Sequence, residues 1–77
     1  MELKDALEWV EGEARAARAR YPAFNTPHEG YAVLLEEVDE LWAEVKKQSQ
    51  PRDNILELRK EAMQVAAMAI RLMVDCT

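Results

Sequence analysis

The sequence predicts an all-α fold, with three helices that form a single domain over residues 1–77. Three segments have apolar residues at helical spacing, and the two short stretches between them contain all three prolines. The composition agrees, because the chain has only two glycines and is rich in residues that favour helix. A chain this short buries only roughly 60% of its unfolded surface, so a lone monomer has marginal stability.

The first predicted helix begins near the N-terminus and runs to about Arg20. Tyr21-Pro22 ends it, because proline cannot donate a backbone hydrogen bond and disfavours helix in the residue before it. The apolar residues that recur along this helix are Leu3, Ala6, Leu7, Val10, Ala14 and Ala17.

The second predicted helix begins at Thr26-Pro27-His28-Glu29, which has the pattern of a capping box. Thr26 can accept from the backbone N–H of Glu29, and the Glu29 side chain can reach back to the start of the helix. The helix fades over Lys46-Lys47-Gln48-Ser49-Gln50-Pro51, and Pro51 opens the second connection. Its predicted core stripe is Tyr31, Leu34, Leu35, Val38, Leu41, Trp42 and Val45.

The third predicted helix starts at Asp53 or Asn54 and runs to about Asp75. From Ala62 to Val74 it is almost entirely apolar, which is typical of a helix that is buried on all sides. Two neighbouring helices cannot enclose a third, so we expect a homo-oligomer, a dimer or a tetramer, with this helix at its centre.

The charge, the single cysteine and the distribution of apolar residues exclude several classes of protein. With 15 acidic and 10 basic residues the net charge is −5, which argues against direct nucleic-acid binding. The single cysteine, Cys76, cannot form an internal disulfide. The chain has no long apolar run and no apolar stretch of the signal-peptide type near its start. We therefore expect a cytoplasmic protein that does not insert into a membrane.

Acidic residues gather on one side of the second helix, where Glu37, Glu40 and Glu44 lie together and Glu36 lies at the edge. The polar residues of the third helix share a stripe broken only by Met68: Glu57, Glu61, Gln64, Arg71 and Asp75. If the two stripes converge, their oxygens are hard ligands that suit Mg²⁺ or Mn²⁺. The alternative is that the acidic face is simply solvated, as most glutamate-rich helix faces are.

The stretch from Leu34 to Leu41, with Glu36-Glu37-Val38-Asp39-Glu40 inside it, is followed by Glu61-Ala62-Met63-Gln64. These two motifs resemble the EExxE and ExxD signature of the MazG-like all-α nucleoside triphosphate pyrophosphohydrolases. The resemblance spans roughly residues 24–72. It implies a magnesium-dependent enzyme, with manganese as an alternative, that splits a nucleoside triphosphate into a nucleoside monophosphate and pyrophosphate.

The resemblance implies that Glu37, Glu40 and Glu61 are metal ligands and that Glu36, at the leading acidic position, is a ligand or supports one. All four are then the catalytic residues, because the sequence has no glycine-rich phosphate loop and no nucleophile paired with a base. Gln64 stands where the family has aspartate, and its amide can coordinate a metal through the carbonyl oxygen but brings no negative charge.

Four residues are candidates for substrate binding: Phe24, Asn25, His28 and Arg71. Phe24 can stack on a base and Asn25 can read a base edge, although a hydrophobic staple and a turn former explain the same residues. His28 also fits a first-turn surface residue. Arg71 lies within the apolar stretch and should pair with an acid or a phosphate.

Three hypotheses follow from the sequence. The first is a pyrophosphohydrolase that removes or controls nucleoside triphosphates. The second is a non-catalytic nucleotide or metal sensor on the same fold, which Gln64 suggests. The third is a helical oligomerisation module whose acidic face is solvated.

Overall fold

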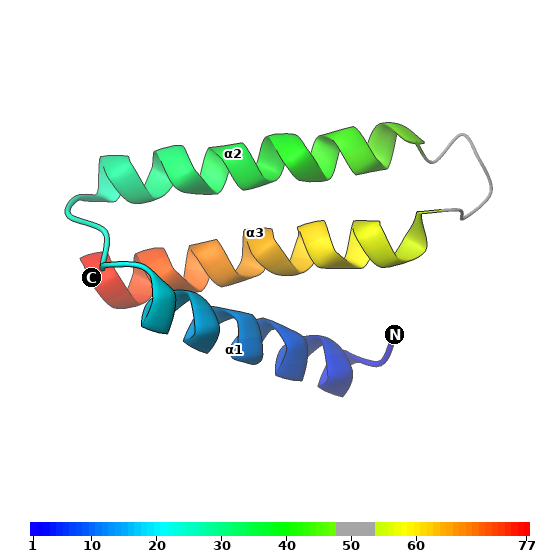
Figure 1. The fold of residues 1–77 in the computed structure, drawn as a ribbon, viewed down its shortest axis with the longest axis horizontal. Coiled ribbons are helices and arrows are strands. Elements are labelled where there is room, and N and C mark those ends of the chain that lie inside the picture. Colours follow the sequence, from blue (N-terminus) through cyan, green and yellow to red (C-terminus); the bar gives the residue numbers. More distant parts are fainter. Residues whose placement is uncertain (48–53) are drawn as a thin grey trace.

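The computed structural model describes residues 1–47 and 54–77, which form three α-helices and no strand. They are α1 (Leu3–Arg20), α2 (Pro27–Lys46) and α3 (Ile55–Cys76). Helix α3 lies between the other two, antiparallel to α2, while α1 runs in the same direction as α3 (Figure 1). Both α1 and α2 pack against α3 but not against each other in the described residues. The predicted all-α fold is confirmed.

The start of α2 follows its sequence signals. Thr26 has extended backbone geometry, and its Oγ1 accepts from the backbone N–H of Glu29 at 3.1 Å. The Glu29 carboxylate reaches back to Asn25, where it accepts from the backbone N–H at 3.0 Å and from the side-chain amide at 3.2 Å. The cap therefore fixes the connection between α1 and α2 as well as the first turn of the helix.

The start of α3 is held differently. Asn54 is the N-cap residue, but its side chain makes no capping bond and instead donates to the Glu44 carbonyl oxygen and to the Glu44 carboxylate, both at 2.9 Å. Asn54 thus ties the start of α3 to the end of α2. The alternative start at Asp53 and the predicted role of Pro51 lie outside the described residues.

The buried core is small and lies where α1, α3 and the connection after α1 meet. It consists of Ala14, Ala17, Phe24, Ala67 and Met68. Alanines on facing helices let α1 and α3 approach closely. The expected burial of α3 on all sides requires an oligomer and stays a prediction, since in the single chain Met73 and Val74 are exposed. The apolar stripe predicted for the first helix is only partly correct, since Leu3 and Leu7 face solvent.

The predicted core stripe of α2 is only partly correct for the single chain, because Leu34 packs against the core but most of the stripe is exposed. Tyr31 and Trp42 are 60% and 57% exposed, and Leu35, Val38 and Val45 are exposed as well, while Leu34 and Leu41 are half-buried. The side that faces α3 carries Gly30, Val33, Glu37 and Glu44 instead, and these residues are buried or half-buried. Helix α2 therefore presents its acidic side to α3 and its most apolar side to the outside.

Gly30 allows close contact between α2 and the core. A Cβ atom at this position would lie 2.4 Å from Leu72 Cδ1 and 3.0 Å from Phe24 Cδ2, closer than a carbon atom can approach without displacement. Glycine therefore lets the Phe24 ring lie flat against the start of α2.

None of the described helices combines the length and the apolar character needed to span a membrane.

Candidate functional site

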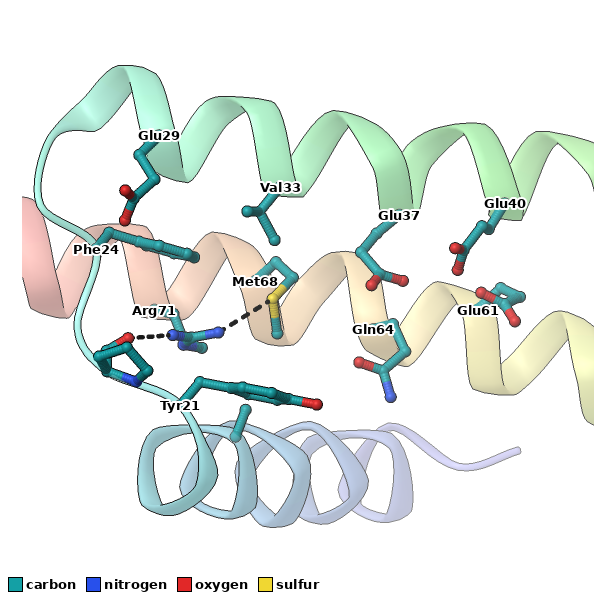
Figure 2. A pocket seen from close by; sticks show the side chains of 12 residues that line it. Tyr21, Phe24, Glu29, Val33, Glu37, Glu40, Glu61, Gln64, Met68 and Arg71 are labelled. Carbon is teal, nitrogen blue, oxygen red and sulfur yellow. Dashed lines mark hydrogen bonds between the residues drawn. The ribbon is translucent and has the colours of Figure 1, made fainter.

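A pocket of about 550 Å³ lies between the three helices and the connection from α1 to α2 (Figure 2). One end is acidic and the other is aromatic and cationic. The lining side chains are Ala17, Tyr21, Pro22, Phe24, Glu29, Val33, Glu37, Glu40, Glu61, Gln64, Met68 and Arg71. The pocket thus combines residues of both sequence motifs with residues that precede α2.

The acidic end brings together Glu37 and Glu40 of α2 and Glu61 of α3. One carboxylate oxygen from each residue lies within 4.8 Å of the corresponding oxygens of the other two. Glu37 and Glu40 share a face because they are three residues apart, and the packing of α2 on α3 places Glu61 opposite them. Glu36 is exposed and lies outside this group. The structure therefore places three of the four predicted carboxylates together.

Burial and mutual repulsion raise the pKa values of two of the three carboxylates in this triad. Burial, followed by the neighbouring Glu40 and then by Glu61 and Glu36, raises the pKa of Glu37 to about 7. Burial, followed by Glu40 and Glu44, also raises the pKa of Glu61. A nearby cation would favour the charged carboxylates and lower both pKa values.

Unsatisfied oxygens in the same place point to a ligand. Glu37 Oε2 and Glu61 Oε2 are buried and accept no hydrogen bond within the described chain. Buried polar atoms normally have partners, and carboxylate oxygens are the donors that Mg²⁺ and Mn²⁺ prefer. The donor set therefore fits a hard divalent cation held by Glu37, Glu40 and Glu61.

Glu44 lies beyond the triad and has a different environment. Its carboxylate accepts from Asn54 at 2.9 Å and from Lys47 at 3.0 Å. These two hydrogen bonds, that of Asn54 first, lower the pKa of Glu44. Glu44 is therefore engaged in joining α2 to α3.

Gln64 lines the pocket next to the triad and is bonded to α1. Its amide Nε2 donates to Glu13 Oε1 at 2.9 Å. Sequence reasoning missed Glu13, although a signal was present: it lies between Val10 and Ala17 on the core side of α1, where a carboxylate is unusual.

Arg71 forms the other end of the pocket and is only 4% exposed. Its guanidinium carbon lies 4.3 Å from the centre of the Phe24 ring and 5.9 Å from that of Tyr21. Nη2 donates to the Pro22 carbonyl oxygen at 3.0 Å, Nη1 contacts the Met68 sulfur at 3.6 Å, and Nε is buried without an acceptor.

The expected acid does not pair with Arg71. No carboxylate in the described ranges forms an ion pair with its guanidinium, and Asp75, one turn further along α3, accepts from the Phe24 backbone N–H at 3.0 Å. Aromatic faces and one carbonyl oxygen compensate a buried cation only in part. Arg71 therefore supplies positive charge to this end of the pocket.

The remaining substrate candidates are distributed unevenly. Phe24 is buried and its ring forms part of the pocket wall (Figure 2). Asn25 and His28 are exposed and do not line the pocket, and Asn25 is hydrogen-bonded to Glu29. Tyr21 and Met68 line the pocket although the sequence did not single them out as binding residues.

Comparison with protein-family models, with curated proteins and with solved structures found no match to this chain.

Proposed function

We propose that this protein is a magnesium-dependent nucleoside triphosphate pyrophosphohydrolase, with manganese as an alternative metal. The observation that carries the proposal is the convergence of Glu37, Glu40 and Glu61 inside a pocket whose opposite end holds Arg71, a buried cation that forms no ion pair within the described residues. The motif resemblance supports it, because the three converging residues are those that the EExxE and ExxD pattern nominates as ligands.

The chemistry divides between the ion and the chain. Bound magnesium would neutralise triphosphate charge and lower the pKa of a coordinated water. Glu37, Glu40 and Glu61 would hold the ion, and the one least engaged as a ligand would accept the proton of the attacking water. Water would attack the α phosphorus, and the bond between that phosphorus and the bridging oxygen would break. The bridging oxygen would leave with pyrophosphate, and the other product would be a nucleoside monophosphate.

The pocket also sets the direction in which a nucleotide lies. Arg71 is ten residues beyond Glu61 on α3, which corresponds to about 15 Å along the helix. The phosphates belong at the acidic end, and the base lies toward Arg71, whose donor-only guanidinium favours a base edge rich in acceptors.

A screen for pyrophosphate release over a panel of nucleoside triphosphates tests the proposal. Release should require Mg²⁺ or Mn²⁺ and stop with a chelator. Glu40→Gln and Glu61→Gln should abolish it and leave helicity by circular dichroism nearly intact, because these side chains serve the ion rather than the core. Asp39→Asn, on the exposed side of α2, is the matched control and should retain activity. Full activity in both glutamine variants would refute the proposed site.

A second candidate is a non-catalytic nucleotide or metal sensor, favoured by the neutral Gln64 beside the triad. The two functions separate cleanly, since a sensor binds cation and nucleotide in calorimetry but releases no pyrophosphate.

We also infer that the working form is a homo-oligomer joined through α2. Its exposed apolar residues Tyr31, Leu35, Val38, Trp42 and Val45 alternate in steps of four and three, the spacing of a helix that packs along another helix. The chain exposes 5650 Å², whereas a compact monomer of 8.8 kDa exposes about 4,800 Å². This excess indicates a chain that is less compact than a typical monomer of its size, which supports association through the exposed face of α2.

A further inference from the structure

We propose that Glu13 of α1 is a positioning residue that fixes the orientation of the Gln64 amide beside the metal site, so that the carbonyl oxygen and not the NH₂ group is free for the cation. The inference rests on the proposed function, because it assigns a role to Gln64 as a neutral ligand of the same cation. It adds a third helix to a site that the sequence motifs place on α2 and α3 alone.

The chemistry of the two side chains fixes the direction of the amide. An ionised carboxylate only accepts hydrogen bonds, and a glutamine amide has one donating and one accepting end. The 2.9 Å contact with Glu13 Oε1 is therefore made by Gln64 Nε2. Figure 2 shows the amide nitrogen turned toward α1 and the amide oxygen turned along the pocket, on the side of Met68.

The carbonyl oxygen is left available for a ligand. Gln64 lines the pocket together with Glu37, Glu40 and Glu61, whereas Glu13 does not. No hydrogen bond to Gln64 Oε1 occurs within the described residues, and amide carbonyls are ordinary ligands for hard cations. With the opposite orientation, the amide would present its NH₂ group to a cation and repel it.

A purely structural role for the Glu13 contact makes different predictions from a positioning role. Glu13 also carries a negative charge, which attracts any cation from a distance. Orientation and long-range attraction are separable, because only orientation acts through Gln64. A double-mutant cycle between Glu13 and Gln64 therefore isolates the positioning effect.

The experiment measures Mg²⁺ and Mn²⁺ affinity by calorimetry in the absence of nucleotide. Glu13→Ala should weaken binding by about tenfold, as removal of a residue that orients a ligand commonly does. Glu13→Gln keeps an acceptor but allows both amide orientations, so it should cost only about twofold. Glu8→Ala is the matched control, because it removes an exposed charge from the same helix and should leave affinity unchanged.

The Gln64→Ala background decides between the two explanations. If Glu13 positions Gln64, Glu13→Ala should have no further effect once Gln64 is gone. An equal loss in both backgrounds, or an equal loss in Glu13→Ala and Glu13→Gln, would show that the charge alone acts and would overturn the inference. Thermal melts without metal establish that each variant folds.

A second measurement is independent of the metal. In ¹⁵N-labelled apo protein, the side-chain amide resonances of Gln64, assigned by their loss in Gln64→Ala, should shift in Glu13→Ala and stay in place in Glu8→Ala. Unchanged resonances in Glu13→Ala would refute the contact.

The failure of the proposed function and the failure of the positioning role are distinguishable. If the wild type binds no divalent cation, or binds it equally well after Glu40→Gln, the proposed function itself fails. If Glu40→Gln abolishes binding and Glu13→Ala leaves it intact, only the positioning role fails.

Discussion

The apo protein should be more stable near pH 5 than near pH 8, because of Glu37. Burial and the adjacent Glu40 raise the pKa of Glu37 from 4.5 to about 7 in the folded state. Between these two values the folded chain holds a proton that the unfolded chain has released, so the free energy of unfolding falls as the pH rises through this window. Above about 7 both states are ionised, and the folded state has the full cost of the charged triad.

The size of the effect follows from the shift. A change from 4.5 to about 7 corresponds to at most about 3 kcal/mol. Glu37 is only half-buried, and solvent in the open pocket screens it, which reduces the expected loss to about 1 to 2 kcal/mol. Glu61 acts in the same direction, since its pKa is also raised. Glu44 acts outside the window, because its lowered pKa makes its contribution disappear only as the pH falls below 4.5.

Urea denaturation followed by circular dichroism, at pH 5 and pH 8 and at one protein concentration, measures the difference. Glu37→Gln should remove most of the fall in stability, and Glu8→Gln, an exposed change on α1, should preserve it. Magnesium should stabilise the protein more at pH 8 than at pH 5, since at the lower pH the ion must displace a proton. Equal or greater stability at pH 8 in the apo wild type would refute the electrostatic reasoning.

Three further predictions test the fold, Gln64 and the assembly. Gly12→Ala should raise the free energy of unfolding by about 0.5 to 1 kcal/mol, since a Cβ atom there meets nothing within 4 Å. Gly30→Ala should fail to show this gain, because its Cβ atom displaces Leu72 and Phe24. Equal gains for both variants in urea titrations would contradict this packing. Gln64→Asp should lower the melting temperature without metal, because it loses the donor to Glu13 and faces it with a second carboxylate, and should tighten Mg²⁺ binding by about 1 kcal/mol; the same metal dependence in both proteins would remove Gln64 from the site. Leu35→Glu combined with Trp42→Glu should yield monomers in sedimentation at micromolar concentration, and a wild type that is itself a stable folded monomer would exclude the proposed association.

Local signals in the sequence predicted the three helices and the acidic end of the pocket. The Thr26 cap and the spacing of apolar residues depend only on neighbours along the chain, so they could be recognised without a structure. The meeting of Glu37 and Glu40 with Glu61 required one more step, that two polar stripes face each other, and the structure confirms it. Glu13 could not be assigned, because its contact with Gln64 spans 51 positions and depends on how α1 is placed.

The error on α2 has a specific physical cause. Both of its faces repeat at helical spacing, one with Leu35, Val38 and Trp42, the other with Val33, Glu37 and Glu40. The rule that the more apolar face is buried assumes that the helix has one partner. It selects the wrong face here because α3 contacts the acidic side, which lines the pocket.

The two faces of α2 therefore have separate tasks, and their energies are linked. Holding Glu37 and Glu61 beside Glu40 without a cation costs free energy, as their raised pKa values show. The described residues contain only a small buried core, so the chain has little stability to offset that cost. Burial of the outer apolar stripe against a second copy would add stability at about 25 cal/mol for each Å² removed from water. Association and cation binding should accordingly reinforce each other, since each stabilises the arrangement of α2 on α3 that the other requires.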